Sequence, residues 1–99
     1  MIAMKIFYPN IEGARFDMDY YIHHHMQKAK ELAGDLCLGI GIEGAVDGAD
    51  MPYIAVGTEY YNTVEDYHKA LDPYRDMLRR DIANFTDITP TIQFFEVKV

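Results

Sequence analysis

The chain has 99 residues with 9 Lys plus Arg against 16 Asp plus Glu, which gives a net charge of −7 at pH 7. This length allows one domain, placed over residues 1–99, and 49 % hydrophobic residues are typical of a globular protein. The acidic balance argues against nucleic acid and anionic membranes as partners, because both select basic surfaces. The single cysteine excludes an intramolecular disulfide and a multi-cysteine zinc site.

Targeting segments are not expected. The apolar run at the N-terminus is too short for a secretory signal, and its flanks differ from those of such signals. The longest apolar stretch, residues 36–42, is far shorter than the ~20 residues that cross a bilayer. We therefore expect a cytoplasmic protein without a membrane partner.

The first third of the chain predicts a strand followed by a helix. Residues 2–8 alternate between two faces, which is typical of a strand. Asp17 is a candidate N-cap, and Gly34 is a plausible end of the helix. At 100° per residue the apolar stripe of this helix contains Met18, Tyr21, Ile22, His25, Met26, Ala29 and Leu32.

A hairpin is expected next. Residues 36–43 alternate and predict a second strand, and residues 53–61 predict a third. The loop that joins them, residues 44–52, contains the turn pair Asp47-Gly48.

The last third predicts a broken helix and a final strand. Thr63 is a candidate N-cap, Asp72-Pro73 interrupts the helix, and a shorter helix continues through Ile82. Residues 91–99 predict the fourth strand. The order βαββαβ indicates an α+β, ferredoxin-like fold with a four-stranded antiparallel sheet.

The strands carry large apolar side chains on both faces, for example at Ile6 and Phe7 and at Phe94 and Phe95. The helices of this fold cover only one face of the sheet. A large exposed apolar patch is rare on a monomer, so a second copy is expected to cover the other face. The sequence therefore predicts a homodimer packed sheet to sheet.

Small residues in the hairpin favour a cavity beneath the helices. Cys37, Gly39 and Gly41 share one parity of the second strand, and Ala55 and Gly57 share one parity of the third. Close packing of a helix is the common use of such residues. The polar-tipped side chains expected opposite them, Tyr21, His25 and Tyr67, favour a pocket instead.

A run of three histidines invites a metal interpretation, which its spacing does not support. Side chains of His23, His24 and His25 point 100° apart on a helix, so they cannot converge on one ion, and no metal is expected. His25 lies at the centre of the apolar stripe. It is either a hydrogen-bonded core residue or a general base oriented by a tyrosine hydroxyl.

The segment Gly39-Ile-Gly-Ile-Glu-Gly44 matches the glycine pattern of dinucleotide sites. That pattern binds pyrophosphate only where a helix begins at its end, and here a loop follows. No nucleotide cofactor is expected.

Two segments of the chain form a recognisable pair. The first reads Tyr8-Pro9-Asn10-x-x-Gly13-x-Arg15-Phe16-Asp17-x-x-Tyr20-Tyr21-x-x-x-His25-Met26, and the second reads Asp81-Ile82-Ala83-Asn84-Phe85-Thr86-Asp87-Ile88-x-Pro90-x-Ile92-Gln93-x-x-Glu96. Together they resemble the EthD family, named for ethyl tert-butyl ether degradation. The chain departs from the common family pattern at Gln27 and Ala83, where proline is usual, so the resemblance does not transfer a particular substrate.

This resemblance implies a dimeric α+β barrel. Proteins of this kind include cofactor-independent quinone-forming monooxygenases, polyketide cyclases and decarboxylases. The helix histidine of the family corresponds to His25, and the tyrosine before it corresponds to Tyr21.

The leading hypothesis is a homodimeric enzyme that acts on a small aromatic or polyketide-like molecule without a cofactor. His25 and Tyr21 are its expected catalytic residues, and Tyr8, Tyr61 and Tyr67 are its expected substrate-binding residues. The alternative is a non-catalytic protein that binds a hydrophobic ligand or serves a partner oxygenase. A haem-degrading relative of the same fold is a third hypothesis, which needs a histidine that ligates iron.

Overall fold

A computed structural model describes residues 1–47 and 50–99 of the chain. Four strands form one antiparallel sheet: β1 (Ile2–Pro9), β2 (Gly39–Gly44), β3 (Tyr53–Tyr61) and β4 (Thr91–Glu96). Their order across the sheet is β2-β3-β1-β4. The predicted α+β, ferredoxin-like arrangement is confirmed.

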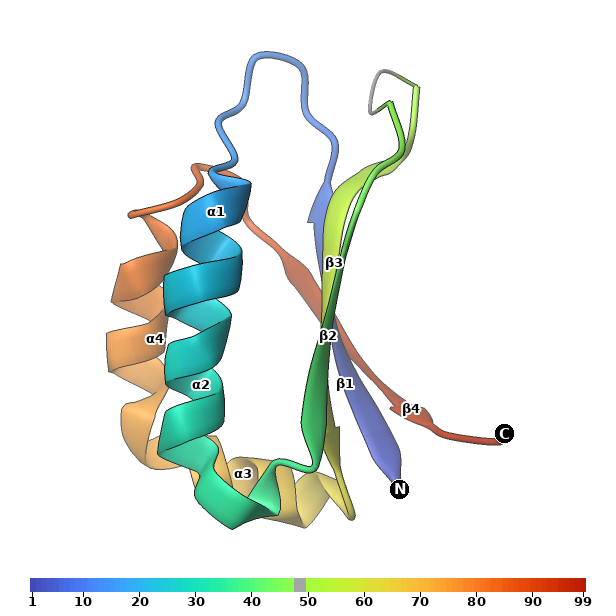
Figure 1. Ribbon diagram of the computed structural model, residues 1–99, viewed down its shortest axis with the longest axis vertical. Helices are drawn as coiled ribbons and strands as arrows, with labels where there is room; N and C mark the ends of the chain where they lie inside the picture. The colour runs from blue at the N-terminus through green and yellow to red at the C-terminus, as the bar shows by residue number, and fades with distance from the viewer. Residues whose placement is uncertain (48–49) are drawn as a thin grey trace.

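The helices all lie on one side of this sheet (Figure 1). The first begins with α1 (Met18–Tyr20), passes through a π-helical turn (Tyr21–His25) and continues as α2 (Met26–Ala33). The second is α3 (Val64–Leu71), and α4 (Arg75–Ile82) follows it. No helix of the described residues is long and apolar enough to cross a membrane.

The predicted helix ends are formed by the expected residues. The Asp17 side chain accepts a hydrogen bond from the Tyr20 amide, at 3.1 Å, and caps α1. Thr63 Oγ1 accepts one from the Asp66 amide, at 3.0 Å, and caps α3. A 3₁₀ turn at Asp72–Tyr74 separates α3 from α4, as the Asp72-Pro73 pair predicts.

Two strand boundaries differ from the predictions by several residues. The second strand begins at Gly39 rather than at residue 36, because Gly34–Leu36 continues the preceding helix as a 3₁₀ turn. The fourth strand ends at Glu96. Gly48, expected in the turn of the hairpin, lies outside the described residues.

The π-helical turn is the main feature of the first helix that the periodicity did not predict. The Met26 amide donates its hydrogen bond to the Tyr21 carbonyl, five residues earlier, instead of to residue 22. The turn therefore holds one more residue than an α-helical turn. Its buried members are Tyr21 and His25.

The small residues of the hairpin do not share one face of the sheet, and Gly57 does not open a cavity. Gly57 pairs with Ile6 of β1, which is packed in the core beneath the helices, whereas Gly41 pairs with Thr58 on the opposite face. The space above Gly57 is filled, because a Cβ built there would overlap the Tyr21 hydroxyl. Close packing of a helix thus explains this glycine.

The face of the sheet without helices carries an aromatic cluster. The Phe7 ring lies 5.3 Å from that of Tyr53 and 6.3 Å from that of Phe95. Lys5 Nζ donates to Thr58 Oγ1 on the same face, at 3.1 Å.

Candidate functional site

A cavity of about 380 Å³ lies between the sheet and the helices. Most of its wall is apolar and includes Met4, Ile6, Leu71, Leu78 and Phe94. Its polar side chains are Tyr8, His25, Glu59, Tyr67 and His68, with Asp72, Arg75 and Arg79 also at the wall. An apolar pocket with a few convergent polar groups is typical of a site for a small organic molecule.

His25 belongs to the wall of this cavity and is only 6 % exposed. Its Nδ1 lies 2.8 Å from Oδ2 of Asp81, which comes from α4. With Nδ1 protonated and donating to this carboxylate, the lone pair of the neutral ring lies on Nε2. Among the described residues Nε2 forms no hydrogen bond. The bond to Asp81 therefore fixes the ring and leaves its basic nitrogen unbound.

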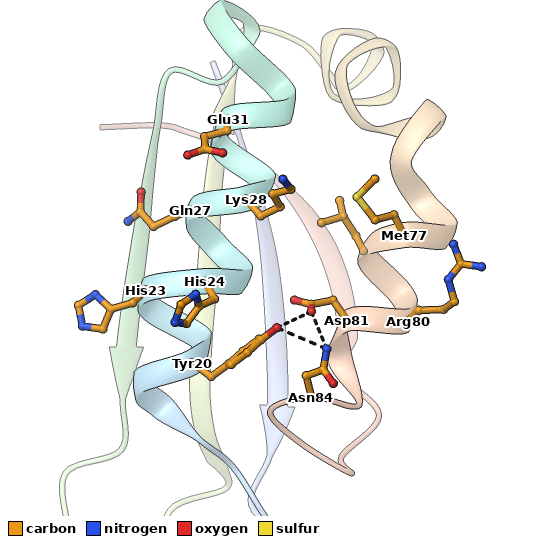
Figure 2. Close-up of a pocket in the computed structure, with 11 residues that line it drawn as sticks. Tyr20, His23, His24, Gln27, Lys28, Glu31, Met77, Arg80, Asp81 and Asn84 are labelled. Carbon is orange, nitrogen blue, oxygen red and sulfur yellow. Dashed lines mark hydrogen bonds between the residues drawn. The ribbon is translucent and has the colours of Figure 1, made fainter.

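Asp81 is itself held by two further side chains (Figure 2). Its Oδ1 accepts from the Tyr20 hydroxyl at 2.7 Å and from Asn84 Nδ2 at 2.9 Å. Figure 2 shows these bonds in a second, more open groove of about 500 Å³ between the first helix and α4. The His25–Asp81 pair thus lies between the two spaces: His25 lines the inner cavity, and Asp81 lines the outer groove.

The surroundings shift the pKa of both members of the pair. Burial lowers the pKa of His25, and the hydrogen bond and charge of Asp81 oppose that effect. Burial acts to raise the pKa of Asp81, but the hydrogen bonds from Tyr20, Asn84 and His25 outweigh it and the pKa is lowered. At neutral pH the pair is a neutral imidazole beside a carboxylate, which is the state a general base requires.

Glu59 is a buried carboxyl of the cavity wall. It faces the helices from β3, is 3 % exposed, and accepts a hydrogen bond from the Tyr61 hydroxyl at 2.7 Å on Oε1. Burial raises the pKa of its carboxyl, while the bond from Tyr61 acts in the opposite direction.

The four tyrosines expected at the site divide into two pairs. Tyr8 and Tyr67 line the cavity. Tyr61 does not line the cavity, and its hydroxyl instead donates a hydrogen bond to Glu59. Tyr21 is 0 % exposed, and its ring stacks on that of His25 with 6.0 Å between centroids.

The expected orientation of His25 by the Tyr21 hydroxyl is not formed. That hydroxyl points at Gly57, interacts electrostatically with the Tyr8 hydroxyl and has no hydrogen bond of good geometry within the described part of the chain. Burial raises its pKa, so the phenol keeps its proton. Asp81 of α4 orients the histidine instead, through its bond to Nδ1.

Asp81 and Glu59 are the site residues that the sequence did not single out. Asp81 lies 56 positions from His25, and only the packing of two helices brings them together. Its place at the start of the second family-like segment was an available signal. Glu59 lies on the core face of β3. A charged residue at such a position was the signal in the sequence that could have identified it as a site residue. His23 and His24 are exposed.

Groups of three or more His, Cys, Asp or Glu that could hold a metal ion do not occur in residues 1–47 and 50–99.

Similarity to known proteins is concentrated in one family. The family model described as the EthD domain matches residues 12–89. The crystal structure of an EthD-like protein from Ralstonia eutropha JMP134 is 34 % identical, with a TM-score of 0.90, and the match covers 99 % of this chain and 92 % of that chain. No curated protein is significantly similar to the chain.

Two more distant structures share the fold. A protein from Bordetella bronchiseptica, assigned as an antibiotic biosynthesis monooxygenase, is 10 % identical with a TM-score of 0.61, over 99 % of this chain and 98 % of that chain. A dimeric protein of unknown function and ferredoxin-like fold from Bacteroides fragilis NCTC 9343 is 9 % identical with a TM-score of 0.62, over 97 % and 95 %.

Proposed function

Because the chain belongs to the EthD family, we propose that it is an enzyme in which His25 removes a proton from a small aromatic or polyketide-like substrate. The observation that carries this proposal is the state of the histidine. Its Nδ1 is bound to Asp81, its Nε2 is unbound, and the residue lines an apolar cavity. A histidine needed only for packing would not require a fixed tautomer at the wall of a cavity.

The proposed step is a single proton transfer. The lone pair of His25 Nε2 takes the proton of a phenol or of a C–H group next to a carbonyl. The electrons of the broken bond move to the substrate oxygen, which becomes a phenolate or enolate, and the ring becomes an imidazolium. Asp81 stabilises this cation through Nδ1, as the bond at 2.8 Å requires no rearrangement.

The electron-rich anion is the common intermediate of several reaction classes. The anion can react with dioxygen or attack a second carbonyl of the same molecule. In a decarboxylase the same kind of anion forms when carbon dioxide leaves. The Bordetella bronchiseptica structure supports the first of these, because its assigned activity is that of a monooxygenase on the same fold. The proposal is therefore a cofactor-independent oxygenase or cyclase, with Tyr8 and Tyr67 in contact with the substrate.

We also propose that the protein is a homodimer. The aromatic cluster of Phe7, Tyr53 and Phe95 lies on the sheet face that no helix covers. The Bacteroides fragilis protein of the same fold is dimeric, which supports this arrangement.

The proton transfer can be tested without knowledge of the later steps. A panel of enolisable aryl ketones and 1,3-dicarbonyl compounds is incubated with the protein in D₂O, and C–H to C–D exchange is followed by NMR. We expect protein-dependent exchange with at least one compound. The variant His25→Ala should lower it by about 100-fold or more, the usual contribution of a general base.

The control is His23→Ala, which alters an exposed histidine of the same helix. It should exchange at the wild-type rate. A compound that binds equally well to wild type and to His25→Gln but exchanges with neither would contradict the proposal and indicate a non-catalytic binding protein.

A further inference from the structure

Glu59 is an unusual residue for the floor of an apolar cavity. It lies in the middle of β3, paired with Met4 on one side and Ile40 on the other. Its hydrogen-bond donor among the described residues is Tyr61, on Oε1, and no Lys, Arg or His forms an ion pair with it. Its second oxygen, Oε2, forms no hydrogen bond with the residues that the structure describes, and the residue lines the cavity.

Burial favours the neutral form of Glu59, and the hydrogen bond from Tyr61 is the one side-chain interaction that opposes it. The residues of the described chain on which Glu59 acts electrostatically are four tyrosines, Tyr8, Tyr21, Tyr61 and Tyr67, and none of them is a cation. The other titratable groups of the cavity wall are engaged or lie at its exposed side: His25 pairs with Asp81, Arg75 and His68 pair with Asp72, and Arg79 is exposed. Burial without a cation is the condition under which a carboxyl keeps its proton.

We infer that Glu59 is protonated in the folded protein and donates a hydrogen bond from Oε2 to the substrate oxygen on which negative charge develops. This inference rests on the proposed function and extends it to a second catalytic residue. His25 approaches the cavity from the helix side and Glu59 from the sheet side. A substrate between them meets a base at its acidic proton and a donor at its oxygen.

The charge balance explains why the donor is needed. Removal of a proton by His25 leaves an anion in an apolar cavity, where an unpaired charge is costly. An ionised Glu59 would repel that anion, whereas a neutral carboxyl stabilises it. The Tyr61 hydroxyl occupies Oε1, so the acidic proton is directed to Oε2 and thus to the cavity.

The inference also narrows the class of substrate. The acceptor of the Glu59 hydrogen bond must be a carbonyl or phenolic oxygen conjugated with the position that loses the proton. A ligand whose only polar group is an amine would instead require Glu59 as a carboxylate.

Infrared spectroscopy tests the protonation state directly. At neutral pH the wild type should show the carbonyl stretch of a buried carboxylic acid, and Glu59→Gln should lack it. Glu43→Gln, which removes an exposed carboxylate from β2, should keep the band and serves as the matched control. Absence of the band from the wild type would overturn the inference.

A phenol that changes colour on ionisation tests the hydrogen bond. We choose 4-nitrophenol, whose apparent pKa in the bound state can be read from its absorbance. The pKa of 4-nitrophenol should be lower when it is bound to wild type than when it is bound to Glu59→Leu. Addition of 4-nitrophenol should also shift the infrared band of wild type. Glu59→Gln should lie between the two, because its amide NH₂ can replace the donor while Tyr61 binds the amide oxygen.

Leucine has a volume similar to that of glutamic acid, and replacing a buried polar group in this way usually preserves the fold. An equal bound-state pKa in wild type and Glu59→Leu would contradict the inference while leaving the His25-dependent exchange intact. The infrared band could instead shift with 4-nitrophenol although the exchange does not depend on His25. That result would support Glu59 as a hydrogen-bond donor and contradict the role of His25 as the base.

Discussion

One glycine and one tyrosine show how closely the first helix approaches the sheet. The Tyr21 hydroxyl occupies the position that a Cβ at Gly57 would take, and Met26 also lies near that position. The tyrosine ring stacks on His25, so the glycine indirectly supports the ring of the proposed base.

The variant Gly57→Ala should therefore destabilise the protein by about 1–3 kcal/mol, the usual cost of overpacking a core. Urea denaturation measures this change. Gly41→Ala is the matched control, because its added Cβ would meet Thr58 at an ordinary 3.9 Å on the other face. The double variant Gly57→Ala with Tyr21→Phe should recover part of the loss. Equal stability of the two single glycine variants would refute the close approach.

At the level of elements, the site depends on the contact between the first helix and α4. The π-helical turn supplies His25, α1 supplies Tyr20, and α4 supplies Asp81. His25 and Tyr20 both form hydrogen bonds with the Asp81 carboxylate, at 2.8 and 2.7 Å. An extra residue in a helical turn redirects side chains, and such turns are frequent at functional sites.

Asp81 is a positioning residue, and Asp81→Asn tests that role. Removing the carboxylate takes away the interaction that opposes burial, so the pKa of His25 should fall further. Because the base acts in its neutral form, the acid limb of the pH–exchange profile should move to lower pH. The exchange rate at neutral pH should fall by about 10-fold, because the ring is held less firmly. Asp76→Asn, on the exposed side of α4, is the control. A lower rate with an unmoved acid limb would indicate a structural role alone.

At the level of the whole molecule, the sheet has two unequal faces. The helices cover one of them (Figure 1), and the core clusters and the cavity lie beneath these helices. On the other face the Phe7 ring contacts the rings of Tyr53 and Phe95. Burial of large apolar side chains is worth about 1.5–3 kcal/mol each, which favours association through this face.

Phe95→Glu should convert the proposed dimer to a monomer, because two copies would bring unpaired carboxylates into an apolar interface. Multi-angle light scattering at low micromolar protein measures the mass. Met77→Glu places the same charge on an exposed residue of α4 and should leave the dimer unchanged. A wild-type mass equal to that of one chain would exclude the homodimer.

Local chemistry made much of the architecture predictable. Alternating strands, the caps Asp17 and Thr63, and the break at Asp72-Pro73 depend on residues close together in the chain, so their pattern is visible in the sequence. The position of His25 on a buried stripe was visible for the same reason. The 3₁₀ turn at Gly34–Leu36 was not, because alternating leucines are compatible with either a strand or a turn.

The sequence by itself determined the order of the elements, the buried stripe that contains His25 and the resemblance to the family, since each depends on local periodicity or on residue identity. Only the tertiary structure decided that Asp81 orients His25, that the Tyr21 hydroxyl fills the space over Gly57, and that Glu59 lines the same cavity. These relations join residues that are 56, 36 and 34 positions apart. A π-helical turn changes the phase of a helix by one residue. Such a change is enough to bring a side chain to a different hydrogen-bond partner.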